Sequence, residues 1–237
     1  MHSYKKVKQS IIQALNQRKW AFNEAIPSEP RLAQKYKVSI GTIRRAINEL
    51  VSENILIREQ GRGTFVISHT EDYMLNVFFR LESKTGIREL PKSNLLGFKK
   101  VKPSKAVVSY LKLLSNEKIY KIKAILTFNQ APAIIDEIHL PVKLFPDLAE
   151  SDFSDRTGTL YKLFQEKYGI TVVKTHETVE ASISTKENAF LLEQKPSQPL
   201  LKITRVAYTY KNIPVDLRIR YIDATNYRYF NTLGGDK

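Results

Sequence analysis

The chain contains no cysteine among its 237 residues. This absence excludes disulfide bonds, thiolate zinc sites and a cysteine nucleophile. No apolar run reaches the roughly 18 residues that a membrane-spanning helix needs, and the N-terminus lacks the apolar core of a secretory signal. We therefore expect a protein that acts in the cytoplasm and has no membrane partner.

The sequence also lacks the motifs of the common enzyme classes. Its four histidines are scattered without the spacing of metal ligands, and neither a phosphate-binding loop nor a nucleophile motif is present. Asp136 and Glu137 are adjacent carboxylates, but neighbours on a strand point to opposite faces, which disfavours a catalytic pair. We expect no catalysis, no metal and no cofactor.

What the chain does have is an excess of positive charge, with a formal net charge of +14. Residues 1–70 hold 12 Lys and Arg against 5 Asp and Glu, and residues 71–237 hold 26 against 19. The excess is equal in the two segments, so it is more than twice as dense in the shorter first one. A basic segment that neutralises phosphates predicts binding to nucleic acid that weakens steeply with salt.

The first 70 residues contain the pattern of three short amphipathic helices. The first runs from Tyr4 to Arg18, and Ser28 and Ser39 are suited to cap the second and third. One face of the third helix is apolar, with Ile43, Ala46, Ile47 and Leu50, and the other carries Gly41, Arg44, Arg45 and Asn48. Arginine and asparagine bind base edges in the major groove, although a solvated helix face has the same pattern.

A short basic hairpin follows the third helix. Residues 55–58 and 64–67 have the pattern of two strands, joined by a turn in which Arg62 stands between Gly61 and Gly63. The glycines allow positive φ angles, so the turn can present a cation to a phosphate or to the minor groove. Three helices followed by a basic hairpin predict a winged helix-turn-helix that binds double-stranded DNA.

This segment contains several short motifs, namely Pro27-Ser28-Glu29, Leu32-Ala33, Val38-Ser39, Thr42-Ile43-Arg44, Ala46, Leu50 and Gly61-Arg62-Gly63-Thr64-Phe65-Val66. With them the segment resembles the DNA-binding domain of the GntR family of bacterial transcription regulators. The resemblance and the exposed faces together give the expected DNA contacts, which are Ser28, Arg31, Ser39, Ile40, Gly41, Thr42, Arg44, Arg45, Gly61, Arg62, Gly63 and Thr64.

The segment departs from the family at two positions that often hold arginine. Pro30 follows the Pro-Ser-Glu motif, and Ile40 follows Ser39. An isoleucine side chain can contact a thymine methyl group but cannot bind guanine as arginine does. The sequence therefore leaves the preferred operator open.

After residue 75 the pattern changes from helices to strands with a few helices between them. The expected strands are residues 77–79, 95–98, 119–128, 133–140, 172–183, 200–210 and 215–223, and the expected helices are 104–112, 159–167 and 186–192. Such an order predicts an α+β domain around a mostly antiparallel sheet. We therefore expect a winged helix-turn-helix in residues 1–70, a linker in 71–75 and a second domain in 76–237.

The second domain resembles the UTRA ligand-sensing domain of the HutC branch of the GntR family. The resemblance rests on Leu140-Pro141, Phe145-Pro146, Thr159-Leu160-Tyr161, Tyr168-Gly169, Glu177, Glu180-Ala181, Leu200-Leu201, Arg205, Pro214-Val215 and Arg218. It implies a chorismate-lyase-like fold, a small effector between sheet and helices, and a homodimer.

The expected effector contacts are Thr159, Tyr161, Glu137, Arg205 and Arg218. A helix start at Thr159 favours an anion through its dipole, but Thr159 also fits a plain N-cap, and a strand arginine also fits a structural ion pair. Phosphosugar sensors in the family tend to carry two arginines that here fall at Ala124 and Leu126. That difference disfavours a phosphosugar.

Together these patterns predict a bacterial DNA-binding transcription regulator. We expect a homodimeric repressor that a small-molecule effector releases from a near-palindromic operator and that is associated with the nucleoid while bound. Two alternatives stay open from the sequence. One is an architectural DNA-binding protein without an effector, and the other is a lyase-like enzyme, which the shared fold alone does not support.

Overall fold

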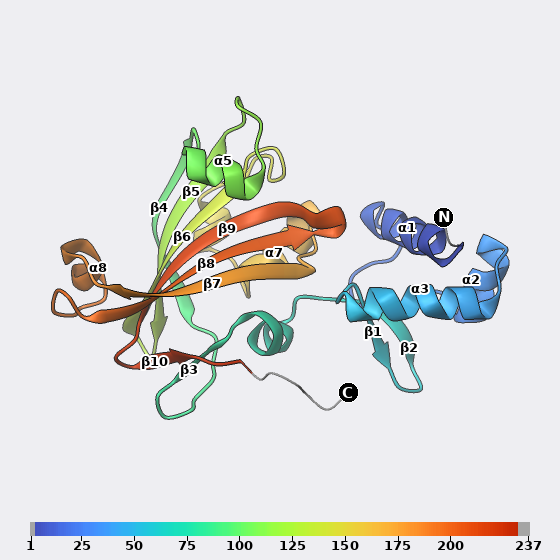
Figure 1. Cartoon of the computed structure of the whole chain (residues 1–237), viewed down its shortest axis with the longest axis horizontal. Coiled ribbons are helices and arrows are strands. Elements are labelled where there is room, and N and C mark those ends of the chain that lie inside the picture. Colours follow the sequence, from blue (N-terminus) through green and yellow to red (C-terminus); the bar gives the residue numbers. More distant parts are fainter. Residues whose placement is uncertain (1–2, 232–237) are drawn as a thin grey trace.

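The computed structural model describes residues 3–231 as two parts along the long axis of the molecule (Figure 1). Three helices and a hairpin form one end, and a large sheet with its helices forms the other. None of the helices in this range is long and apolar enough to pass through a membrane.

The N-terminal part is a three-helix unit with a β-hairpin. Its elements are α1 (Ser3–Asn16), α2 (Glu29–Tyr36), α3 (Ile40–Ser52), β1 (Leu56–Glu59) and β2 (Gly63–Val66). Ile11, Leu32 and Leu50 are fully buried at its centre. These elements confirm the predicted winged helix-turn-helix.

The two predicted helix caps differ. The Ser39 hydroxyl accepts a hydrogen bond from the Thr42 N–H at 3.2 Å, as an N-cap should. Ser28 occupies the N-cap position of α2, but its side chain makes no capping bond. Pro30 lies in the first turn of α2 and has no N–H to offer, which removes one of the free donors that a cap would satisfy.

The connection between the two parts is itself helical. Residues 71–75, where the sequence suggested a linker, lie in α4 (Glu71–Tyr73) and the start of a π-helical turn, η1 (Met74–Phe78). The prediction of a strand at residues 77–79 is wrong, because this segment is the end of that turn and the residue that follows it. Met74 and Phe78, four residues apart, both bury their side chains. A short apolar run does not distinguish a buried turn from a strand.

Six antiparallel strands form the main sheet, in the order β4-β5-β6-β9-β8-β7. They are β4 (Lys92–Val101), β5 (Ile119–Phe128), β6 (Ala131–Pro141), β7 (Lys174–Ile183), β8 (Pro199–Thr209) and β9 (Ile213–Asp223). β3 (Leu81–Ser83) and β10 (Tyr227–Tyr229) pair separately. The α+β class and the antiparallel sheet are as predicted.

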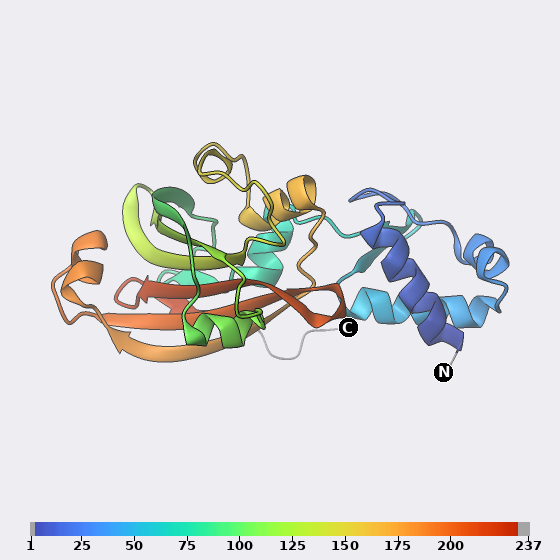
Figure 2. The ribbon, with the colours of Figure 1, turned by 90° about the horizontal axis from the view of Figure 1, so that it is seen from above.

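Helices cover both faces of this sheet, as Figure 2 shows for α5 and α7. The helices are α5 (Lys105–Leu111), α6 (Ser151–Ser154), α7 (Leu160–Tyr168) and α8 (Lys186–Leu191). α6 and α7 pack on the face that carries Ile122 and Ile138, and α5 packs on the opposite face against Leu217. Since side chains alternate along a strand, each strand supplies residues to both layers.

The two parts of the molecule touch where β8 and β9 turn. The short helical turn η2 (Tyr210–Asn212) joins these strands, and the β8–β9 end of the sheet points toward α1 in Figure 1. Tyr210 is buried among the core residues of the three-helix unit, with Val173 packed beside them. The sheet therefore contributes directly to the core of the N-terminal part.

Candidate DNA-binding surface and effector site

One acidic residue organises the arginines beside the third helix. The Glu29 carboxylate, in the first turn of α2, accepts hydrogen bonds from Arg44 Nε at 3.0 Å and from Arg58 Nη2 at 3.2 Å. Arg44 lies on α3 and Arg58 on β1, and both side chains remain largely exposed, at 61% and 44%. Glu29 thus fixes two guanidinium groups where α2, α3 and the hairpin meet.

The other arginine of the exposed α3 face has a different environment. The Arg45 guanidinium lies 4.0 Å from the centre of the Tyr4 ring, a cation–π contact with α1. Ile40, in the first turn of α3, is 44% exposed. Ile40 therefore adds an exposed apolar side chain to the helix face that carries Arg44, four residues further along.

The hairpin presents Arg62 at its tip. Gly61 and Gly63 adopt φ angles of 73° and 123°, which only glycine accepts without strain. The Arg62 side chain is 72% exposed, pairs with Glu59 and lies 5.4 Å from the centre of the Phe65 ring. The turn therefore holds a cation outward between two backbone positions that carry no side chain.

The twelve residues expected to contact DNA come from three places in the N-terminal part, the start of α2, the first half of α3 and the hairpin. Ten of them are exposed, and Thr42 and Thr64 are half-buried. Arg58 and Glu29 belong to the same surface but were not expected. Strand alternation does not indicate Arg58, since Arg58 lies two residues after the buried Leu56 and so shares its face of β1.

A second candidate site is a cavity between the sheet and the N-terminus of α7. Its volume is about 130 Å³, small beside the roughly 300–1,000 Å³ of pockets for drug-sized ligands. The polar side chains that line it include Asp136, Arg156, Thr159, Tyr161, Arg218 and Arg220. In this state the cavity suits a small ion or one charged group of a larger ligand. Residues 3–231 contain no cluster of acidic and histidine side chains that would hold a metal.

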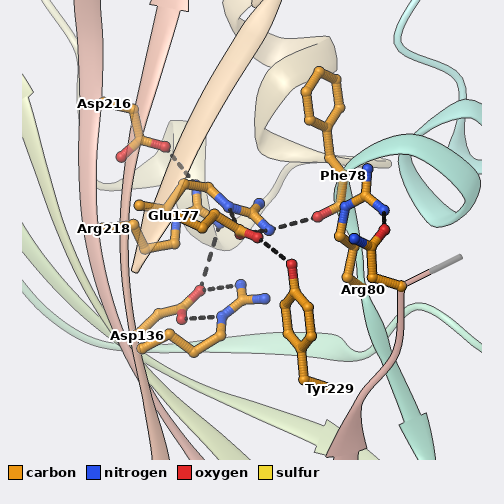
Figure 3. Close-up of polar contacts among 10 residues, drawn as sticks. Phe78, Arg80, Asp136, Glu177, Asp216, Arg218 and Tyr229 are labelled. Atoms are coloured by element: carbon orange, nitrogen blue, oxygen red, sulfur yellow. Dashed lines mark hydrogen bonds and ion pairs between the residues drawn. The ribbon is translucent and has the colours of Figure 1, made fainter. Parts of the chain in front are cut away.

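Buried ion pairs of Asp136, Arg218 and Arg220 line this cavity, and Figure 3 shows their contacts. Arg220 donates two hydrogen bonds to Asp136, both at 2.7 Å. Arg218 lies between Asp136, at 3.5 Å, and Asp216, at 2.9 Å. Burial alone would raise the pKa of Asp136, but Arg220 and Arg218 hold it below its usual range. Asp136 is therefore a carboxylate whose charge is already matched.

The network continues away from the cavity through Arg205. Its guanidinium pairs with Glu177 and donates to the Phe78 carbonyl oxygen, and the Tyr229 hydroxyl donates to Glu177 at 2.8 Å. These bonds join β7, β8, η1 and β10, as Figure 3 shows. Arg205 is thus engaged in holding the π-helical turn on the sheet.

Arg156 is the cation that this network leaves unmatched. Arg205, Arg218 and Arg220 each pair with an acid, whereas the half-buried Arg156, in the loop before α7, donates only to the Phe153 carbonyl oxygen among the described residues. Burial lowers its pKa and the nearby charge of Arg218 lowers it further, while the charge of Asp136 opposes this shift only in part. A bound anion would stabilise this cation.

Other polar atoms at the cavity also lack partners. Within residues 3–231, Arg156 Nε, Arg218 Nε and the Tyr161 hydroxyl are buried and make no hydrogen bond. Burial raises the pKa of Tyr161, so the hydroxyl keeps its proton and can donate it. A buried donor without a partner costs free energy, so these three donors are suited to a ligand that accepts hydrogen bonds.

Some of the expected effector contacts line the cavity and others do not. Thr159, Tyr161 and Arg218 line the cavity. The Thr159 hydroxyl accepts a bond from the Lys162 N–H, so it caps α7 as the simpler alternative supposed. Arg205 lies in the structural network, and Glu137 lies on the opposite face of β6 from Asp136, because neighbours on a strand alternate.

Two arginines at the cavity differ in how clearly the sequence indicates them. Arg156 was missed because it lies in an irregular loop, where no periodicity indicates its direction. Arg220 was foreseeable, since it lies two residues after Arg218 on one strand and so shares its face. Ala124 and Leu126 are buried on the cavity side of β5, and Leu126 lines the cavity without offering a charge.

Comparison with known proteins identifies both parts. Residues 88–228 match the UTRA domain, and residues 3–66 match the bacterial regulatory proteins of the gntR family. The "Probable fructoselysine utilization operon transcriptional repressor" of Escherichia coli strain K12 is 28% identical over 213 residues, 90% of this chain and 86% of that protein. The histidine utilization repressor of Pseudomonas aeruginosa is 27% identical over 206 residues, 85% of this chain and 80% of that protein.

Solved structures share the fold. The ligand-binding domain of a GntR-family regulator from Bordetella bronchiseptica superposes with a TM-score of 0.62 at 28% identity, over 65% of this chain and 96% of that one. The regulator YydK of Bacillus subtilis matches 99% of this chain and all of its own, with a TM-score of 0.58 at 16% identity. The family and these relatives are transcription regulators and not enzymes. The chain belongs to the GntR family of bacterial regulatory proteins, in its HutC branch, with a DNA-binding helix-turn-helix followed by a UTRA effector-binding domain.

Proposed function

We propose that this protein is a transcriptional repressor that leaves its operator when a small carboxylate anion binds beside Arg156. One observation carries the proposal, the half-buried Arg156, without an acidic partner within residues 3–231, at a cavity where Arg218 Nε and the Tyr161 hydroxyl also lack hydrogen-bond partners. The cavity belongs to the UTRA domain, and the DNA-binding surface belongs to the other domain. Binding at one site and release at the other require coupling between them.

Two arginines of the N-terminal domain have separate roles in binding DNA. Arg44, on the exposed face of α3, enters the major groove and binds a base edge, with Glu29 fixing its direction. Arg62, at the hairpin tip, binds a phosphate or the minor groove. The remaining expected contacts lie at the helix starts and in the turn of the hairpin. They fix the position of the DNA backbone on the protein.

The protein binds a near-palindromic operator as a homodimer. Two recognition helices then lie in successive major grooves, about 34–36 Å apart. We assign DNA binding to residues 1–70, the connection to 71–75, and effector binding and dimerisation to 76–237. While bound to its operator the dimer is associated with the nucleoid. Sedimentation velocity tests the assembly, because a monomer at concentrations that saturate the operator contradicts it.

The effector class follows from the charges at the cavity. Arg156 and Arg218 supply cations, and the N-terminus of α7, with Thr159 and Tyr161, supplies donors and a favourable dipole. Ala124 and Leu126 supply neither. Relatives are named for fructoselysine, histidine and mannosyl-D-glycerate systems, and each of these compounds bears a carboxylate.

A thermal-shift screen of small carboxylates, sulfate and phosphorylated sugars tests this site. A ligand at 100 times its dissociation constant adds about 2.7 kcal/mol to the free energy of unfolding. We expect a carboxylate to stabilise the wild type, and Arg156→Met to abolish the shift. Arg228→Met is the matched control, because Arg228 is an exposed arginine of the same domain that pairs with Glu82. Equal shifts in Arg156→Met and wild type contradict the proposal.

A further inference from the structure

Gln165, on α7, binds the chain segment that leaves the DNA-binding part. Its side-chain oxygen accepts a hydrogen bond from the His69 N–H at 2.8 Å, and its side-chain nitrogen donates to the Ile67 carbonyl oxygen at 3.2 Å. Gln165 is 1% exposed, and Ile67 directly follows the last strand of the hairpin. One buried side-chain amide thus binds two backbone groups of the connecting segment, the Ile67 carbonyl oxygen and the His69 N–H.

His69 is completely buried in the same place. Its Nε2 donates to the Val172 carbonyl oxygen at 2.8 Å. The ring packs against three aromatic rings, with centroid distances of 5.6 Å to Tyr73, 5.8 Å to Phe78 and 5.8 Å to Tyr161. The connecting segment is therefore inserted into the effector domain rather than lying on its surface.

Tyr161 joins this anchor to the effector cavity. It lines the cavity, the Arg218 guanidinium lies 5.7 Å from its ring centre, and its other neighbours include His69 and Phe78. Tyr161 and Gln165 are four residues apart on α7, so they lie one turn apart on the same side of one helix. A shift of α7 that admits a ligand beside Tyr161 also moves Gln165.

We propose that α7 transmits effector binding to the DNA-binding domain, with Tyr161 reporting on the cavity and Gln165 and His69 moving the connecting segment. The inference rests on the proposed function for the identity of the effector site, and it adds the residues that couple the two sites. The positions of α7 with and without a bound effector then correspond to two positions of Ile67 and of the hairpin that precedes it. Coupling of this kind changes affinity by factors of about 5 to 150.

Operator affinity measured with and without a small anionic probe tests the coupling. Malonate and inorganic phosphate at constant ionic strength serve as probes, and thermal shift reports their binding separately. We expect Gln165→Leu to bind the probe like wild type while the probe no longer changes operator affinity. Glu166→Gln, the next residue on the same helix and an exposed one, is the matched control and keeps the wild-type response. An unchanged response in Gln165→Leu overturns the inference.

A double-mutant cycle tests the same path without any ligand. Tyr161→Leu removes the ring between the cavity and His69, and it should alter operator affinity in the wild-type background but not in Gln165→Leu. The inference is overturned if the two substitutions act additively on operator affinity, or if Tyr161→Leu has no effect on it. Failure of both probes to bind the wild type contradicts the proposed effector site, while the cycle still decides the coupling.

Discussion

At the residue scale, a few acidic and aromatic partners decide how each arginine is used. Arg44 and Arg58 are held by Glu29, and Arg45 is held over Tyr4, whereas Arg62, which pairs with Glu59 on its own hairpin, lies at the tip of a turn between two glycines. Arginines with fixed directions suit base recognition, which requires geometry, and an arginine at a loop tip suits a phosphate, which requires charge.

Substitution of Arg44 and Arg62 separates these two uses. Arg62→Ala should weaken binding to all sequences alike and reduce the salt slope by about one ion. Arg44→Ala should cost about 1–3 kcal/mol at the preferred operator and also relax base preference at one position. Fluorescence anisotropy over a series of salt concentrations and operator variants measures both. If the two variants lose affinity equally at every site, Arg44 does not bind a base.

His69 should make stability depend on pH. Burial lowers its pKa from 6.5 to about 4. The unfolded chain therefore binds more protons than the folded chain between these values, so the free energy of unfolding falls as pH falls below 6.5. The expected loss between pH 7.5 and pH 5 is about 2 kcal/mol.

Urea unfolding at the two pH values measures this dependence. His69→Gln keeps a donor toward Val172 but does not titrate, so it should lose about 2 kcal/mol less than wild type over the same interval. A pH dependence identical in the two proteins means that His69 is exposed or charged in the folded state.

At the scale of elements, β9 determines the chemistry of the effector domain. Asp216, Arg218 and Arg220 are two residues apart along it, so all three point to the face that α7 covers. The sequence predicted these strands well, because long alternating runs such as residues 119–128 and 215–223 leave little choice. It failed at residues 77–79, where a short apolar run forms a π-helical turn through contacts with distant strands.

The sequence indicated the DNA-binding surface better than the effector cavity, because the two sites differ in how far apart their residues lie in the sequence. The DNA-binding residues lie close together in sequence, so helix periodicity and turn chemistry indicated their surface. The effector cavity combines β6, β9, α7 and the loop that holds Arg156. No local pattern specifies which of these side chains meet, so the sequence indicated Arg218 and Tyr161 but also placed Glu137 and Arg205 with them.

Arg220→Met tests the buried network on β9. It removes both hydrogen bonds to Asp136, whose side chain is 2% exposed, and leaves a buried carboxylate short of its main partner. Loss of one member of a buried ion pair typically costs about 3–5 kcal/mol. The exposed pair of Lys202 and Glu180 is the control, and Lys202→Met should cost less than about 1 kcal/mol.

Urea unfolding of both variants gives the two free energies. Equal, small losses would mean that water reaches Asp136 and that the network is not a rigid floor for the cavity. A large loss in Arg220→Met that Asp136→Asn partly restores supports the buried pair, because the second change removes the unmatched charge.

At the scale of the whole molecule, the two domains share more than a flexible connection. Tyr210 from the β8–β9 end of the sheet is buried in the DNA-binding core, and Gln165 and His69 fix the connecting segment. The orientation of the DNA-binding surface therefore depends on elements of the effector domain. In a dimer on two half-sites, a change in that orientation alters the spacing of the recognition helices.

The most direct test is the effect of a carboxylate effector on operator binding. Operator affinity is measured by fluorescence anisotropy with the carboxylate that gives the largest thermal shift, for wild type, Arg156→Met and the control Arg228→Met. We expect the effector to weaken operator binding by a factor of about 5 to 150 in wild type and Arg228→Met, and to leave it unchanged in Arg156→Met. An effector that binds the protein without changing operator affinity, or that releases Arg156→Met as readily as wild type, would contradict this expectation.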